Sequence, residues 1–219
     1  AAVVLEHIGY AVDYVDVRGT LPTGPLGDRY AGIVTWFTDD RVPNPTAYRG
    51  WLMSQIESGV KVAILDHLGF SADAAWERKL GLSRGERNIS GELRTVVSNS
   101  DFTGFEASAA PRRNLFHPLR IEGDNVRRLL SVEDTRGQRM DAVFTSWWGG
   151  LSAYPYLLEE GHDYSYRWIT NPFAFLKQAL RLPDLPAPDV TTQDGRRMLI
   201  VHIDGDGFVS RAAMPGNDY

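Results

Sequence analysis

Two aspartates stand one residue apart in the stretch HIDGDGF at 202–208, directly after the apolar run MLIV at 198–201. Residues two apart in a strand face the same side, so Asp204 and Asp206 converge if the strand continues that far. Paired carboxylates at the carboxyl end of a strand suit a divalent metal ion or a general base. Asp-Gly is also a common turn dipeptide, and this local pattern leaves the turn and the site equally open.

A second pair of titratable side chains, Asp66 and His67, directly follows the apolar run at 60–65. Open α/β sheets tend to keep their sites at the carboxyl ends of strands, which makes the pair a candidate base and orienter. A purely structural pair in a loop is the competing interpretation. The chain has no cysteine and no serine in a G-x-S-x-G turn, which argues against nucleophilic acyl transfer.

Aromatic residues gather in the stretch SWWGGLSAYPYL at 146–157. Aromatic faces bind the apolar faces of sugars well, and the cluster therefore supplies candidate carbohydrate contacts. These are Trp147, Trp148, Tyr154 and Tyr156. Packing in the core or in an interface is the alternative for such a cluster.

The elements that would position these residues alternate between helix and strand over the first 80 residues. We expect helices from the N-terminus to a stop at Gly9, over 44–59 with Asn44 as cap, and over 71–80 with Ser71 as cap. Strands are expected at 12–17, 32–37 and 60–65. This alternation predicts an α/β fold whose sheet is open and mostly parallel, flavodoxin-like or glutamine-amidotransferase-like, with helices on both faces. Because the chain opens on a helix, we expect the first strand to be missing or supplied from elsewhere.

The pattern changes after about residue 88, where short strand candidates predict an antiparallel extension of the sheet. They lie at 92–99, 116–121, 126–133 and 141–147, with a hairpin turn at 134–139. An Asn-Pro start predicts a helix over 171–182, and a stiff linker rich in proline follows. We therefore expect an α/β domain at 1–182, a linker at 183–196 and the first strand of another domain at 197–219.

Charge and hydropathy exclude some classes of partner. The 219 residues carry a formal net charge of −5, which argues against a nucleic-acid partner. No apolar run reaches the roughly 18 residues that a membrane helix needs, so no membrane span is expected. The stretch GTLPTGPLGD at 19–28 precedes a strand and is not G-x-G-x-x-G, and we interpret it as a loop.

The stretch MLIVHIDGDGFVSRAAMPG at 198–216 resembles the first strand of the deacetylase domain in PelA-like proteins, which process the Pel exopolysaccharide of bacterial biofilms. The resemblance implies that Asp204 is the catalytic base and that Asp206 is a ligand of zinc or a similar divalent metal. A metal-bound water would then attack the acetamide carbonyl of an N-acetylated sugar while the metal polarises that oxygen. The resemblance therefore implies a hydrolase whose polysaccharide deacetylase domain forms a barrel.

The family's metal site also needs two histidines, usually four residues apart on one helix face. No two histidines of this chain have that spacing; they are His7, His67, His117, His162 and His202. We therefore expect the deacetylase site to be incomplete here, the chain to be an inactive fragment, and no cofactor to be bound by it.

The rest of the chain is similar to the middle region of PelA-like proteins, between their glycoside hydrolase and deacetylase modules. The likeness is carried by VDYVDVRG at 12–19, GVKVAILDHLGF at 59–70 and WITNPFAFLKQAL at 168–180. It implies a periplasmic protein that deacetylates and hydrolyses a polymer rich in N-acetylgalactosamine. Its α/β domain would be a non-catalytic spacer or docking module whose partners are the polymer, the neighbouring hydrolase and deacetylase domains, and export-machinery proteins. An independent flavodoxin-like enzyme or ligand-binding domain, with its site at the strand carboxyl ends, is the alternative.

Overall fold

The computed structural model describes residues 1–85, 90–113, 117–161, 165–185, 192–193 and 196–197. The chain divides into two units, residues 1–185 and 186–219. In the second unit the described residues form a short antiparallel pair, β11 (Thr192–Gln193) and β12 (Arg196–Arg197). The predicted acidic pair, Asp204 and Asp206, and the expected start of a deacetylase barrel lie outside the described residues.

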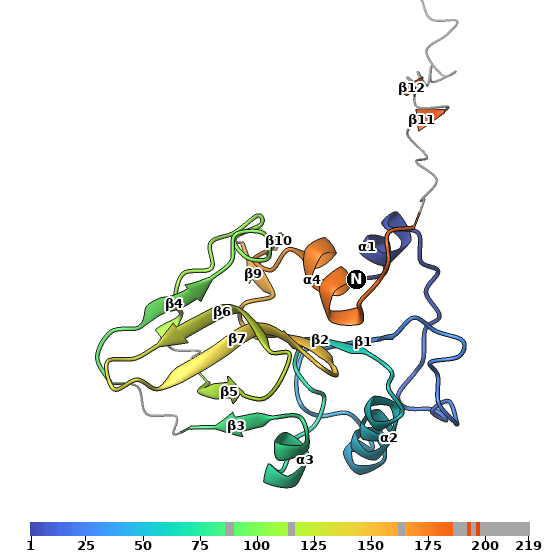
Figure 1. Ribbon diagram of the computed structural model, residues 1–219, viewed down its shortest axis with the longest axis horizontal. Coiled ribbons are helices and arrows are strands. Elements are labelled where there is room, and N and C mark those ends of the chain that lie inside the picture. Colours follow the sequence, from blue (N-terminus) through green and yellow to red (C-terminus); the bar gives the residue numbers. More distant parts are fainter. Residues whose placement is uncertain (86–89, 114–116, 162–164, 186–191, 194–195, 198–219) are drawn as a thin grey trace, which may run out of the picture. The chain divides into compact units, whose positions relative to one another are not determined.

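Six strands of the first unit form one mixed sheet (Figure 1). Their order across the sheet is β1 (Ile33–Phe37), β2 (Val62–Asp66), β8 (Gly149–Ala153), β7 (Arg139–Ser146), β6 (Arg127–Glu133) and β4 (Arg94–Ser98). The strands β1, β2 and β8 pair in parallel, and the pairings from β8 through β7 and β6 to β4 are antiparallel. The α/β fold and its antiparallel extension are confirmed, and the prediction of a mostly parallel sheet is wrong. From β6 to β8 the connections are short hairpins, which can join only antiparallel neighbours.

Helices cover both faces of the parallel strands, as predicted. Figure 1 shows α1 (Ala2–His7) and α4 (Pro172–Leu180) on one side of β1 and β2, with α2 (Pro45–Glu57) and α3 (Ala74–Lys79) on the other. Between these layers β2 is buried on both of its faces from Val62 to Leu65. Burial on both faces explains why β2 is a continuous apolar run and shows no alternation. None of the helices in the described ranges is long and apolar enough to cross a membrane.

The two Asn-Pro starts form helices for a local reason. The Asn44 side chain accepts a hydrogen bond from the backbone N–H of Ala47, and the Asn171 side chain accepts from Phe173 and Ala174. Each asparagine thereby satisfies N–H groups that have no partner inside the helix. The helix α3 begins later than predicted, because the Asp73 side chain accepts from Trp76 N at 2.8 Å. The cap is therefore Asp73, and the prediction of Ser71 is wrong.

The segment 12–17 is not a strand, contrary to the prediction from its alternating pattern. Tyr14 is 83% exposed and Val15 is 47% exposed, whereas Val12 and Val17 are partly buried against the core. Alternation predicts a strand because one face is normally buried, and here the burial is only partial. The side chain of Asp13 accepts a hydrogen bond from the Tyr30 hydroxyl at 2.8 Å, which fixes the segment as a loop.

Two small antiparallel pairs complete the first unit. The strand β3 (Leu82–Arg84) pairs with β5 (Leu119–Ile121), and β9 (Leu158–Glu160) pairs with β10 (Tyr166–Trp168). Of these strands only β5 overlaps a predicted one. The central strand β8 was also not predicted, because its stretch begins with two glycines, which are uncommon in strands.

Candidate functional site

The carboxyl ends of the three parallel strands meet at one edge of the sheet. Phe37, the last residue of β1, is in register with Asp66 of β2, which is in register with Ala153 of β8. The residues that follow these strands therefore come close together. We call the resulting group the strand-end site, and it consists of Trp36, Asp40, Asp66, His67, Tyr154 and Trp168.

The backbone of Asp66 is held between the two neighbouring strands. Its carbonyl oxygen accepts a hydrogen bond from Tyr154 N at 3.1 Å, and the next residue, His67, donates from its backbone N–H to Phe37 O at 3.3 Å. Asp66 has a φ of 71°, in the left-handed region that aspartate tolerates better than most residues. This conformation turns the chain out of the strand and brings His67 over the sheet edge.

The His67 ring is fixed on two sides. It stacks on the Tyr154 ring with 5.2 Å between centroids and 27° between planes. On its other side, His67 Nδ1 lies 3.8 Å from a carboxylate oxygen of Asp40, and the second oxygen of Asp40 accepts from Gly69 N at 3.1 Å. The sequence indicated Asp66 and His67 as a pair and Tyr154 independently of them. It gave no indication of Asp40, which is the carboxylate that faces the imidazole.

Two tryptophans extend the site, and the sequence analysis missed both. The rings of Trp36 and Trp168 lie 5.6 Å apart at 50°, and the Trp36 side chain lies close enough to the Asp66 carboxylate to favour its ionised form. Trp36 is 38% exposed and Tyr154 is 39% exposed, so two aromatic side chains of the site reach solvent. Trp36 lies at the end of a predicted strand and was identifiable from that position. Trp168 has no such local signal, because only the tertiary fold brings it to this edge.

Burial raises the pKa of Asp66 above its ordinary value, and the His67 charge and the Trp36 side chain oppose this effect only in part. The folded state therefore holds the proton more tightly than the unfolded chain. Stability is lost as the pH rises from the ordinary pKa of 3.8 through the raised value, and the full penalty is present above that value.

Replacing Asp66 with asparagine removes this penalty while the side chain still accepts a hydrogen bond and tolerates the left-handed backbone. We expect Asp66→Asn to increase the free energy of unfolding at pH 7 and to leave it unchanged below pH 3.8. Urea denaturation across this pH range measures the difference, with the exposed Asp124→Asn as the control. If wild type and Asp66→Asn have the same free energy of unfolding at pH 7, the expected stabilisation is absent and the prediction is wrong.

The aromatic stretch 146–157 does not form one surface. Trp148 is 1% exposed and donates from its indole nitrogen to Leu80 O, and Tyr156 is 0% exposed and accepts from Arg112 N. Both belong to the core, which leaves no ring face for a sugar. Trp147 and Tyr154 are each 39% exposed. They lie before the first and after the last residue of β8, and so at opposite ends of that strand.

An apolar cavity of about 640 Å³ adjoins the site along the free edge of β1. It lies between this strand and the loop from Ala11 to Val17, and Trp36 and Phe37 form part of its wall. Thr35 and Tyr48 also line it and are buried. Burial raises the pKa of Tyr48 far above its ordinary value, so the cavity presents neutral hydroxyl groups among apolar walls.

The first unit thus has a mixed α/β fold, and aromatic rings and carboxylates lie together at the carboxyl ends of its parallel strands. In the described ranges no group of three or more histidine, aspartate or glutamate side chains is placed to hold a metal ion. No family model matches the chain, and no similar curated protein or solved structure was found.

Proposed function

We propose that the chain belongs to a PelA-like exopolysaccharide-modifying protein and that its α/β unit is a non-catalytic module that binds the polymer. The observation that carries this proposal is the strand-end site, where exposed aromatic rings stand beside carboxylates. Aromatic faces pack against the apolar faces of sugar rings, and carboxylates accept hydrogen bonds from sugar hydroxyls. A site of this composition suits a carbohydrate better than it suits an apolar ligand.

The charge of the site favours a polymer that has lost part of its acetyl groups. Deacetylation of an N-acetylated sugar leaves an ammonium group, which is attracted both to a carboxylate and to the face of a tryptophan ring. Asp40 and Asp66 supply the carboxylates, and Trp36 supplies a ring that lies close to one of them. The proposed ligand is therefore a partially deacetylated polymer rich in N-acetylgalactosamine.

The remaining parts of the proposal rest on the sequence resemblance. We place the protein in the periplasm, with hydrolase and deacetylase domains as neighbours and export-machinery proteins as further partners. The metal of the deacetylase domain would be held by residues that include Asp206, outside the described residues. No part of the proposal for the α/β unit depends on that metal.

Replacing Trp36 with alanine is the direct test. The loss of one stacked ring and its attraction for an ammonium group is expected to weaken polymer binding about tenfold. Isothermal titration calorimetry with a partially deacetylated N-acetylgalactosamine oligomer measures the effect. Circular dichroism of the same sample establishes that the variant is folded.

Trp147→Ala is the matched control, because Trp147 is 39% exposed, as against 38% for Trp36, but lies beyond the opposite end of β8. We expect its affinity for the oligomer to equal that of wild type. If Trp36→Ala and Trp147→Ala lose the same affinity for the oligomer, the effect comes from removing any exposed tryptophan and not from the strand-end site. A wild-type protein that fails to bind the oligomer would overturn the proposal itself.

The cavity beside β1 supports one alternative, a flavodoxin-like domain that binds a small molecule at the strand carboxyl ends. Its volume of about 640 Å³ falls in the usual range for small-molecule sites, and its walls are mostly apolar. Visible absorbance of the purified protein distinguishes the two functions, because a bound flavin absorbs visible light and the polysaccharide does not.

A further inference from the structure

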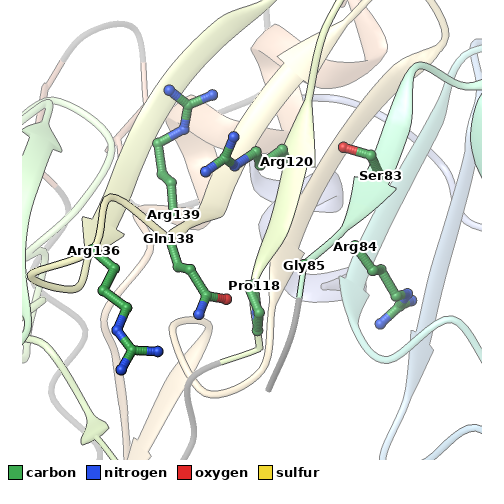
Figure 2. Close-up of a pocket in the computed structure, with 8 residues that line it drawn as sticks. All are labelled: Ser83, Arg84, Gly85, Pro118, Arg120, Arg136, Gln138 and Arg139. Atoms are coloured by element: carbon green, nitrogen blue, oxygen red, sulfur yellow. The ribbon is translucent and has the colours of Figure 1, made fainter. Parts of the chain in front are cut away.

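A second pocket, of about 410 Å³, lies between the β3–β5 pair and the β6–β7 hairpin and concentrates positive charge. Four arginines line it together with the polar side chains of Ser83 and Gln138 (Figure 2). They are Arg84, Arg120, Arg136 and Arg139. Among the described residues that line it there is no carboxylate, although the chain as a whole carries a net charge of −5. The pocket therefore departs from the charge of the rest of the chain.

Two of the four arginines are held by carboxylates behind the wall of the pocket. Arg84 forms an ion pair with Glu77, which is buried. Arg139 Nε lies 2.9 Å from a carboxylate oxygen of Asp141, and Arg139 Nη2 lies 3.1 Å from one of Glu122. These contacts fix the two side chains in place and compensate their charges.

The other two arginines have no carboxylate hydrogen-bond partner within the described part of the chain. Arg120 Nη2 donates to the backbone carbonyl of Gly137 at 2.7 Å, which positions the guanidinium without pairing its charge with a carboxylate. Gly137 directly follows Arg136 in the hairpin, so this bond brings Arg120 to the turn that carries Arg136. In the view of Figure 2 the Gln138 side chain lies between Arg120 and Arg136.

The nearby carboxylate of Asp134 already has three backbone hydrogen bonds, two from the hairpin and one from Ser90. It accepts backbone N–H groups of Ser90, Arg136 and Gln138, each at 2.9 Å. Burial opposes ionisation of Asp134, but its backbone hydrogen bonds outweigh burial and lower its pKa, and the charge of Arg136 adds to this lowering. The side chain of Arg136 itself is exposed. The pocket thus presents two guanidinium groups to the solvent side.

We propose that this pocket binds the phosphate monoester of a small molecule, with the phosphate between Arg120 and Arg136. A phosphate monoester carries a charge of about −1.5 to −2 at pH 7, which matches two guanidinium groups that form no ion pair with a carboxylate of the described residues. Guanidinium forks bind phosphate oxygens through paired hydrogen bonds, and the Ser83 side chain adds a neutral hydrogen-bonding group. A volume of about 410 Å³ suits a small organic molecule better than a bare ion.

Isothermal titration calorimetry on the full chain tests the proposal with three probes: glucose 6-phosphate, inorganic phosphate and glucuronate. We expect glucose 6-phosphate to bind most tightly and its affinity to fall as salt rises. Inorganic phosphate shares the charge but not the organic group, and glucuronate shares a sugar ring but carries one charge. If inorganic phosphate binds as tightly as glucose 6-phosphate, the assignment of a phosphate monoester is wrong. If glucuronate binds as tightly as glucose 6-phosphate, the second negative charge of the phosphate does not contribute and the proposal is wrong.

The variant R136Q is expected to bind glucose 6-phosphate about tenfold more weakly, because a charge-assisted hydrogen bond is lost. The double variant R120Q/R136Q is expected to lose further affinity. R136Q alone keeps the test valid if the double variant fails to fold, since the Arg136 side chain makes no hydrogen bond among the described residues. R41Q removes one exposed arginine elsewhere and should leave binding unchanged. Wild-type affinity in R136Q, or an equal loss in R41Q, would overturn the proposal.

The pocket shares no residue with the strand-end site. Its test is therefore independent of the test of polymer binding, and either can fail while the other stands.

Discussion

Replacing Asp141 with alanine is expected to lower the free energy of unfolding by about 3 kcal/mol. Asp141 lies on β7, is 0% exposed and ties three strands together. One of its carboxylate oxygens accepts from the backbone N–H of Ile121 on β5 at 3.0 Å, and the other accepts from the Ser131 hydroxyl on β6 at 2.7 Å. Arg128 and Arg139 approach the same carboxylate at 3.3 and 2.9 Å.

The size of the effect follows from what the variant leaves behind. Among the described residues, Arg128 and Arg139 keep only Glu122 as a carboxylate partner. The Ile121 N–H and the Ser131 hydroxyl lose their acceptor. Polar groups that are buried without a partner cost more than a hydrogen bond contributes. Breaking a buried ion pair usually costs about 3–5 kcal/mol. The side chains of Arg128 and Arg139 are 27% and 26% exposed, and water therefore stabilises them in part. This partial exposure places the expected loss at the lower end of that range.

Chemical denaturation with guanidinium chloride measures the change in the free energy of unfolding, and two further variants serve as comparisons. Ser131→Ala removes one neutral partner of the same carboxylate and should cost about 1 kcal/mol. Asp124→Ala removes an exposed carboxylate on the neighbouring loop and should change stability by less than about 0.5 kcal/mol. If Asp141→Ala is as stable as Asp124→Ala, the carboxylate does not tie the strands together.

The parts of the fold that could be predicted from the sequence are those specified by neighbouring residues. The helices α2 and α4 begin at Asn44 and Asn171, where an asparagine cap and the following proline act within one turn. The strand β2 could be predicted because four consecutive residues of its sequence are apolar, and the structure buries all four. The β6–β7 hairpin was indicated by its turn residues, in which Gly137 takes a φ of 78°.

The elements that were mispredicted depend on contacts that are distant in sequence. Residues 12–17 alternate like a strand, but no layer of the described fold covers Tyr14 and Val15. The strand β8 starts with Gly149 and Gly150, which locally favour a turn, and it forms because it is inserted between β2 and β7. Sequence periodicity reports which residues prefer burial, and the tertiary fold decides whether that burial is available.

The strand-end site was predicted in parts and not as a whole. Asp66 and His67 were identified because they follow a buried strand, and Tyr154 was identified as one of several aromatic residues. Their contact depends on β8 lying next to β2, although more than eighty residues separate the two strands in the sequence. Trp168 reaches the site only through the fold, whereas its partner Trp36 lies at the end of a predicted strand and could have been identified from that position.

The strongest single test of this arrangement is Gly149→Ala, which we expect to lower the free energy of unfolding by at least about 3 kcal/mol. Gly149 has a φ of 142°, a backbone conformation that residues with a side chain rarely adopt. A Cβ atom there would lie 1.9 Å from the carbonyl oxygen of Val62, the residue paired with it on β2. The two strands must separate to accept it. Asp66 ends β2 and Tyr154 directly follows β8, so separating these two strands moves both residues of the strand-end site apart. We therefore expect Gly149→Ala to weaken polymer binding as well.

The same substitution at Gly50 is the control, and we expect it to change the free energy of unfolding in the opposite direction. Gly50 lies inside α2, is exposed, and no atom lies within 4 Å of the position of its added Cβ. Alanine is the better helix former, so Gly50→Ala should raise the free energy of unfolding by about 0.5–1 kcal/mol. Denaturant melts of both variants are compared with wild type. Because both variants add one methyl group, opposite signs can arise only from the space and the backbone conformation at each position. A stable Gly149→Ala would mean that β8 does not pair closely with β2, and the strand-end site would then lose the register that brings its side chains together.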